Sequence, residues 1–211
     1  MSDFVSNKAV TWQRSGAWER IPGPAPAGAQ GGAAGVIATP LEHYGIATVI
    51  ARHDTARALE DYFTSSHGVT PPARPAVASG RNCTVVWEGP ARWLALSRDR
   101  TWPAKLAKEL GGIAAVSDQS GGRALLHLRG VRMRDALAKG CPIDLHPRAF
   151  APGNAAVTII AQIGIHLWRL PSDDGLHLAV FRSMAGSFWS WLHASAAELG
   201  LEVAPAGAGR R

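Results

Sequence analysis

The sequence predicts an α+β protein built from two similar units, each an antiparallel sheet with helices on one face. Short runs of apolar and β-branched residues, typical of strands, alternate with amphipathic segments that end near glycine. The order of these segments in the second half nearly repeats the order in the first, which predicts two βαββαβ-like units. With 211 residues, of which 46% are hydrophobic, the chain is long enough to form an apolar core in each of two such units.

The first predicted unit spans residues 41–118. Its first helix can be capped by Asp54 and ends at Gly68, and its second helix opens at Thr101 with Pro103 in the first turn. Between the two helices, a proline-rich turn and a Gly-Pro turn separate the strand-like runs. The expected elements are, in order, a strand at 45–51, a helix at 54–68, strands at 83–87 and 93–97, a helix from 101, and a strand at 114–116.

The second predicted unit spans residues 119–203 and is followed by a flexible C-terminus at 204–211. The turn signal SDDG at 172–175 predicts a hairpin, and a four-residue turn would place His177 opposite Leu170. The expected elements are, in order, a strand at 125–128, a helix at 131–139, strands at 156–161, 165–170 and 176–181, and a helix at 184–199.

Residues 1–40 are predicted to form an extended tail, because 22–40 consist almost entirely of glycine, alanine and proline and can bury little apolar surface. Three large apolar side chains, Trp12, Trp18 and Ile21, precede this stretch. They could fold back onto their own domain or anchor the tail on a neighbouring subunit. Tryptophan is enriched at interfaces and only 18% of the chain is charged, so these three are candidate partner-interface residues.

The sequence shows no signal for export or membrane insertion. The first ten residues include charged Asp3 and Lys8 and lack an apolar run, and no membrane-spanning stretch is predicted. Cys83 and Cys141 belong to no Cys-x-x-Cys pair and are expected to be reduced thiols, which favours a cytoplasmic protein. The net charge of +6 is concentrated in 98–139, but no nucleic-acid motif accompanies it, so no nucleic-acid partner is expected.

No catalytic, cofactor-binding or metal-binding residues are predicted. The eight histidines show no i, i+4 pair and no zinc-ligand spacing with cysteine, and His166 and His177 are not expected to face each other. Ser120, Asp144 and His146 could be imagined as a hydrolase triad, but the Gly-x-Ser-x-Gly elbow is absent from the sequence. Neither glycine-rich nucleotide fingerprint is present.

The most distinctive segment of the chain is 117–150. It contains the runs SDQSGGR, RDAL and KGCPIDLHPRAF. This segment closely resembles the gamma subunit family of heterotetrameric sarcosine oxidase, and the helix-forming run FWSWL at 188–192 belongs to the same pattern. Together the resemblance covers roughly residues 45–199.

A more distant resemblance is to the folate-binding aminomethyltransferase superfamily, which includes the T-protein of glycine cleavage. The residues that carry it are Asp118, Gly130, Ala136–Leu137 and Asp144. In the T-protein an acidic pair leads into the strand that supplies the catalytic aspartate. The corresponding strand here, 163–169, lacks that pair, and Asp173 and Asp174 lie in the following turn. Proton transfer needs a positioned carboxylate, so independent folate chemistry is not expected.

The resemblance to sarcosine oxidase implies a non-catalytic, structural gamma subunit. The enzyme would oxidatively demethylate sarcosine or a related N-methyl amino acid and pass the one-carbon unit to tetrahydrofolate. The partners would be the alpha, beta and delta subunits, which would hold FAD, FMN, NAD and zinc, while this chain would bind no cofactor. Two alternatives stay open: an independent folate-binding one-carbon transfer protein, and an RNA-modification accessory module.

Overall fold

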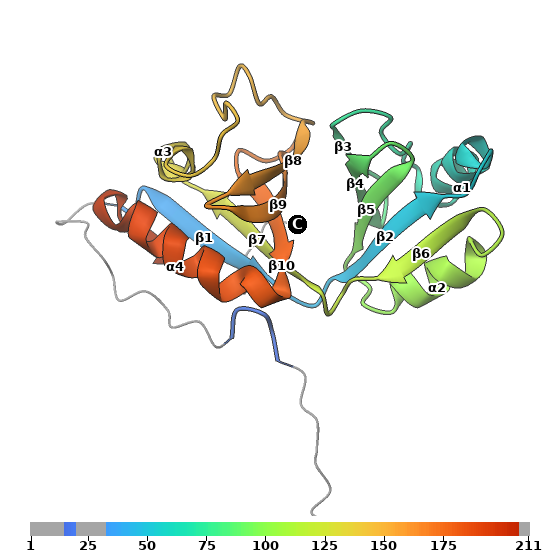
Figure 1. Ribbon diagram of the computed structural model, residues 1–211, viewed down its shortest axis with the longest axis horizontal. Helices are drawn as coiled ribbons and strands as arrows, with labels where there is room; N and C mark the ends of the chain where they lie inside the picture. The colour runs from blue at the N-terminus through green and yellow to red at the C-terminus, as the bar shows by residue number, and fades with distance from the viewer. Residues whose placement is uncertain (1–14, 20–32, 207–211) are drawn as a thin grey trace, which may run out of the picture.

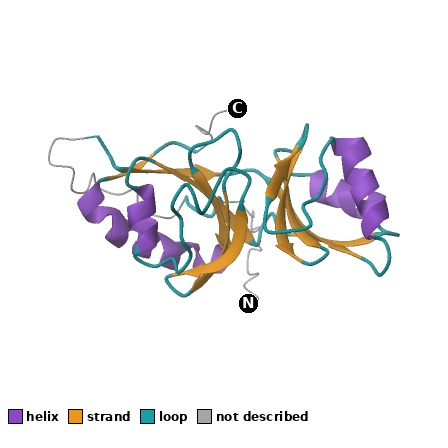
Figure 2. Cartoon of the chain, turned by 90° about the horizontal axis from the view of Figure 1, so that it is seen from above, coloured by secondary structure: helices purple, strands orange, loops and turns teal. Residues whose placement is uncertain are grey.

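The computed structural model describes residues 15–19 and 33–206. They form two β-sheets that face each other, and two α-helices cover the outer face of each sheet (Figure 1). Seen from above, the layers follow one another as helices, sheet, sheet, helices (Figure 2). The predicted α+β class, with helices on one face of each sheet, is confirmed.

The first unit is a five-stranded antiparallel sheet with the strand order β3-β4-β5-β2-β6. Its elements are β2 (Gly45–Ala51), α1 (Ala56–His67), β3 (Val77–Ser79), β4 (Cys83–Gly89), β5 (Arg92–Ser97), α2 (Trp102–Glu109) and β6 (Ala114–Asp118). Gly68 ends α1 in the left-handed conformation, with φ of 65°. Thr55, and not Asp54, occupies the position before α1, and its hydroxyl donates to the carbonyls of Arg52 and Ile113.

The second unit repeats this order of strands around its own sheet, β8-β9-β10-β7, followed by β1 and β11. Its elements are β7 (Arg123–Arg129), α3 (Met133–Ala138), β8 (Ala155–Ile160), β9 (Ile163–Trp168), β10 (Leu176–Phe181), the 3-10 helix Arg182–Met184, α4 (Ala185–Ala196), the 3-10 helix Ala197–Leu199 and β11 (Leu201–Val203). Each unit therefore has the order βαβββαβ. The predicted βαββαβ lacked β3 and β11, because three residues are too few to show an alternating pattern.

Strand β1 (Val36–Leu41) lies at the end of the segment predicted as a tail. It inserts between β7 and β11 in the sheet of the second unit, antiparallel to β7 and parallel to β11. Val36 and Ala38 are fully buried. Neighbours on both sides satisfy the hydrogen-bonding groups of its backbone, so this stretch becomes a central strand despite its small side chains.

The apolar core of the described residues has three parts. Each sheet packs against its own helices, through Leu59 and Phe63 of α1 in the first unit and through Phe188 and Leu192 of α4 in the second. The third part lies between the two sheets. It contains Ile46, Val77, Val86, Leu94, Leu96, Leu125, Ala155, Trp168 and Ala179. Each sheet therefore buries apolar side chains on both faces, and the two units share this central layer.

Leu94, fully buried in β5 between the sheets, tests this arrangement. We expect Leu94→Ala to lower the free energy of unfolding by about 2–5 kcal/mol, because it removes packing from both sheets and leaves a cavity. Urea denaturation measures the change. As a matched control, Val131→Ala removes a side chain that is 92% exposed, and its expected effect is below about 0.5 kcal/mol. Equal effects of the two substitutions would contradict the shared central layer.

Candidate functional site

A buried charged cluster joins the two sheets. Glu88 is the extra residue of a bulge in β4, where Trp87 pairs with Trp93 but Gly89 pairs with Arg92. Its carboxylate reaches across to the other sheet, where Oε1 lies 2.9 Å from Nε2 of His166 and 3.3 Å from Nη2 of Arg123. The second oxygen accepts a hydrogen bond from Nε of Arg92 at 2.8 Å. The cluster therefore links β4 with β7 and β9.

Opposing effects set the protonation of this cluster. Burial raises the pKa of the Glu88 carboxyl. Hydrogen bonds from His166 and Arg92, together with Coulombic interactions with these residues, outweigh that effect and lower the pKa to about 2. Burial lowers the pKa of Arg123, and the negative charge of Glu88 opposes that shift. The side chains of Glu88, Arg123 and His166 are at most 7% exposed. Glu88 is therefore an ionised carboxylate held in place by cationic neighbours.

Arg123 also borders a cavity of about 260 Å³ at the junction of the two units. Its guanidinium lies 3.9 Å from the ring centroid of Phe181, a cation–π contact. Ser15 also lines the cavity, and its carbonyl accepts a hydrogen bond from Arg182 at 2.7 Å. The cavity has both cationic and acidic walls, because Arg100 and Glu42 line it too.

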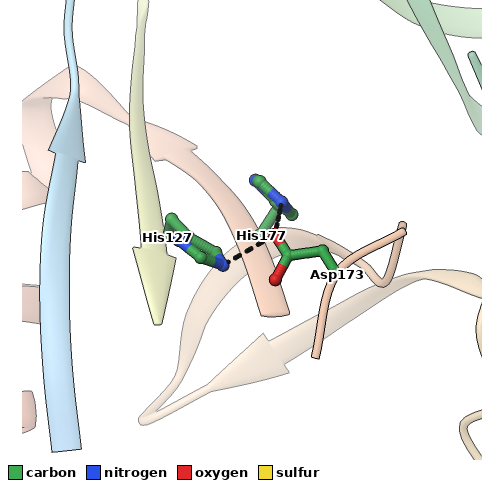
Figure 3. Close-up of side chains that lie close together, drawn as sticks. All are labelled: His127, Asp173 and His177. Carbon is green, nitrogen blue, oxygen red and sulfur yellow. Dashed lines mark hydrogen bonds and ion pairs between the residues drawn. The ribbon is translucent and has the colours of Figure 1, made fainter. Parts of the chain in front are cut away.

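A second polar cluster contains His127, Asp173 and His177 (Figure 3). His127 on β7 pairs directly with His177 on β10, and the two rings stack with centroids 4.5 Å apart. Oδ2 of Asp173 lies 2.9 Å from Nε2 of each histidine. Trp168 extends the row onto β9, with its ring 5.6 Å from that of His177. Side chains from two strands and one turn thus converge on a single point.

The turn between β9 and β10 positions Asp173. It is longer than the sequence predicted, so His177 lies opposite Trp168 and not opposite Leu170. The Asp173 carboxylate accepts a hydrogen bond from the backbone N–H of Gly175 at 2.8 Å, which fixes the turn. A Cβ atom at position 175 would overlap Nε2 of His127. Glycine at this position therefore lets the turn approach the histidine.

Charge and burial act in opposite directions on this cluster. The hydrogen bond with His177 is the main cause that lowers the pKa of the Asp173 carboxyl, and burial opposes it. Burial lowers the pKa of His127, and the neighbouring His177 lowers it further. Asp173 is therefore a carboxylate beside an imidazole that burial keeps neutral.

Sequence reasoning missed this cluster. Along the sequence, the histidine nearest to His177 is His166 on the same hairpin, whereas the residue that pairs with His177, His127, lies on a strand about fifty residues earlier. The only signal that could have found the pair is the pairing of β7 with β10, which the repeat of the two units implies. His166 pairs with Ala179 and is not opposite His177, as the sequence predicted.

Among the candidate interface residues, Trp18 lies within the chain's own core. Its side chain is 6% exposed and its Nε1 donates a hydrogen bond to the carbonyl of Leu125 at 2.8 Å. Its ring lies 6.1 Å from that of Trp189 on α4. Trp18 therefore folds back onto the second unit, which is the first of the two arrangements that the sequence left open. Trp12 and Ile21 lie outside the described residues.

The residues of the imagined hydrolase triad have local structural roles. Oγ of Ser120 accepts a hydrogen bond from the backbone N–H of Ile46 at 2.9 Å. Asp144 accepts a hydrogen bond from the backbone N–H of His146 at 2.8 Å, and both of these residues are exposed in a loop. These contacts stabilise turns.

Both cysteines are free and buried. Burial raises the pKa of the Cys83 thiol to about 11 and also raises the pKa of Cys141, so neither is a reactive thiolate near neutral pH. Within the described ranges, no helix is long and apolar enough to cross a membrane.

The charged cluster should make the stability of the chain depend on pH. The folded-state pKa of Glu88 lies below its ordinary value of 4.5, so its contribution to stability is present above pH 4.5 and is lost as the pH falls toward about 2. We expect Glu88→Gln to lower the free energy of unfolding at pH 7 by about 3–5 kcal/mol, because Arg123 remains buried without its carboxylate. Urea denaturation at pH 7 and pH 3 measures both effects.

The difference between wild type and Glu88→Gln should be smaller at pH 3 than at pH 7. Glu60, exposed on α1, supplies the control. Glu60→Gln should change stability by less than about 0.5 kcal/mol at either pH. A pH-independent difference for Glu88→Gln would show that the carboxylate charge does not hold the sheets together.

The buried ring of Trp18 should contribute to the stability of the chain. Trp18→Ala should destabilise the chain by about 3–5 kcal/mol, because the ring fills the core of the second unit. Trp18→Phe keeps most of the packing and loses only the hydrogen bond to Leu125, so it should cost about 1 kcal/mol. Thermal denaturation of the full chain measures both. Unchanged stability of Trp18→Ala, combined with weaker subunit association, would favour the role of partner anchor.

Comparisons with known proteins agree with the resemblance carried by 117–150. Residues 56–198 match the model of the family described as "Sarcosine oxidase, gamma subunit family". Curated sarcosine oxidase gamma subunits from Arthrobacter sp and Corynebacterium sp. (strain P-1) are 41% identical over 87 residues and 37% identical over 107 residues. These matches cover 40% and 46% of this chain and 43% and 50% of the relatives. The chain therefore spans about half the length of the curated relatives it matches.

Solved structures share the fold over most of this chain. A chain of the heterotetrameric sarcosine oxidase from Corynebacterium sp. U-96, in complex with pyrrole 2-carboxylate, matches with a TM-score of 0.76 and 26% identity over 88% of this chain and 96% of that one. The glycine cleavage system aminomethyltransferase T from Bartonella henselae matches with a TM-score of 0.57 and 14% identity, over 82% of this chain and 48% of that one. The second match is one of fold alone. The chain belongs to the sarcosine oxidase gamma subunit family.

Proposed function

We propose that this chain is the structural, non-catalytic gamma subunit of a heterotetrameric sarcosine oxidase-type flavoenzyme. The observation that carries the proposal is the match to a chain of a heterotetrameric sarcosine oxidase, which extends over 96% of that chain. The enzyme would oxidatively demethylate sarcosine or a related N-methyl amino acid and pass the one-carbon unit to tetrahydrofolate. Its alpha, beta and delta subunits would hold FAD, FMN, NAD and zinc, in a cytoplasmic assembly.

The inner contacts of the chain support a scaffold role. The Glu88 carboxylate pairs with Arg123 and lies 2.9 Å from His166 between the sheets, and Ser120 is bonded to the backbone of Ile46. These groups hold the two units together, so they are not available to act on a substrate. The folate-binding alternative is less well supported, since Asp173, the acidic residue after β9, is hydrogen-bonded to His177 and lies 2.9 Å from His127.

An exposed apolar edge supports contact with a partner subunit. β8 is the edge strand of its sheet, and its Val157 and Ile159 are 49% and 53% exposed. Apolar side chains on an unpaired edge strand are an association site unless another surface covers them. We propose that a large subunit of the oxidase covers this edge.

Co-expression with the candidate partner subunits tests the proposal. The chain should co-purify with two larger subunits as a yellow complex that absorbs as a flavoprotein. Ile159→Asp should weaken this association by at least about tenfold, because a charge at a desolvated contact is left unpaired. Val131→Asp, at a site that is 92% exposed and outside the edge, should leave it unchanged.

A colourless monomer that does not bind the two larger subunits would overturn the proposal. Calorimetry of the full chain with tetrahydrofolate distinguishes the folate-binding alternative, which requires saturable heat of binding. Salt-dependent binding of tRNA would favour the RNA-modification module.

A further inference from the structure

We propose that His127, Asp173 and His177 form a binding site for one divalent transition-metal ion, with zinc as the preferred ion. The inference concerns this chain's own residues and does not rest on the proposed function. The sequence predicted no metal ligands, because the three residues show no ligand spacing along the chain. The pairing of β7 with β10 brings them together in space.

The donor atoms are those that zinc prefers. Two imidazole nitrogens and one carboxylate oxygen lie within 4.8 Å of one another, and the two N···O distances are both 2.9 Å. Donors around a tetrahedral zinc ion lie about 3.3 Å apart, since Zn–N and Zn–O bonds are about 2.0–2.2 Å long. Small displacements therefore convert the cluster into three ligands of a tetrahedral site, with water as the fourth.

One of the three candidate ligand atoms has no hydrogen bond in the described part of the chain. Nε2 of His127 is buried, and although it lies close to Asp173, it makes no hydrogen bond within the part of the chain that the structure describes. The His127 side chain is only 8% exposed, so water has little access to this nitrogen. A buried nitrogen that lies near a carboxylate but is not aligned for a hydrogen bond is costly unless something else satisfies it. A bound cation would do so.

The site also has an approach for an ion. The Asp173 and His177 side chains are 27% and 13% exposed, so the cluster opens toward solvent on the side of the turn. Asp173 belongs to that turn, between β9 and β10, whose backbone can shift more readily than a strand. The stacked histidine rings are tilted by 22° and must turn further for both nitrogens to face the ion.

The surroundings match those of a metal site. The carboxylate that would ligate the ion is already fixed by the backbone N–H of Gly175, which is the kind of outer contact that orients metal ligands. On the other side, the Trp168 ring stacks on His177. An ion held here would tie β7, β10 and the β9–β10 turn together.

Titration of the chelator-treated full chain with zinc tests the proposal. We expect saturable binding of one ion per chain by calorimetry, and cobalt(II) bound at the same site should give the visible absorption of a tetrahedral complex. Asp173→Asn and His177→Gln should each weaken zinc binding by at least about a hundredfold, since loss of even an outer partner of a ligand costs about ten- to a hundredfold.

The control is the exposed pair of His53 and Asp54, which lie 2.7 Å apart on the surface without a third ligand. His53→Gln should leave zinc affinity unchanged. Circular dichroism and thermal denaturation without metal establish that each variant is folded, and the partly exposed Asp173 carries the test if the histidine variant is not. In an assembled complex, Asp173→Asn should contain one metal ion fewer per gamma chain than wild type.

Two results would overturn the site. One is the absence of saturable zinc or cobalt binding to the wild-type chain. The other is binding of equal strength in wild type, Asp173→Asn and His177→Gln. Either would mean that the cluster is a stack of aromatic rings with a bridging carboxylate and no metal.

Discussion

The contact between Glu88 and the opposite sheet is the constraint on which the rest of the molecule depends. A carboxylate with 4% exposure is tolerable only when charged and polar partners surround it. Arg123 on β7 and Arg92 on β5 supply the positive charge, and Nε2 of His166 on β9 lies 2.9 Å away. The bulge in β4 places the carboxylate there. Because an unmatched charge in this layer is more costly than a lost apolar contact, the cluster fixes how the two units face each other.

The duplicated fold explains why polar groups gather where they do. In each unit one face of the sheet is covered by helices, so the other face must meet its counterpart. His127, His166 and His177 all lie on this second face of the larger sheet. Toward the centre of the layer the opposite sheet provides a partner, Glu88, whereas His127 and His177 find theirs in a turn of their own unit. The same geometry thus produces a structural cluster and a candidate ion site.

The sequence predicts those features that local patterns encode. The alternation of strands and helices, the stop at Gly68 and the repeat of the two units can all be recognised without coordinates. Features that depend on distant pairing cannot. β1 is a strand only because β7 and β11 flank it, Trp18 is buried only because the second unit receives it, and His127 meets His177 only through strand register. Propensity and spacing contain no information on such contacts.

The position of β1 has a consequence for the order of folding. This strand precedes the first unit in the chain but pairs with residues of the second, Val36 with Leu201 and Ile37 with Arg129. During synthesis the first unit can assemble around its own sheet, whereas β1 stays unpaired until its neighbours β7 and β11 have been made. Such long-range closure slows folding and leaves an unpaired strand exposed in the interim. A ribosome-bound chain that ends before β11 would therefore present this edge to chaperones.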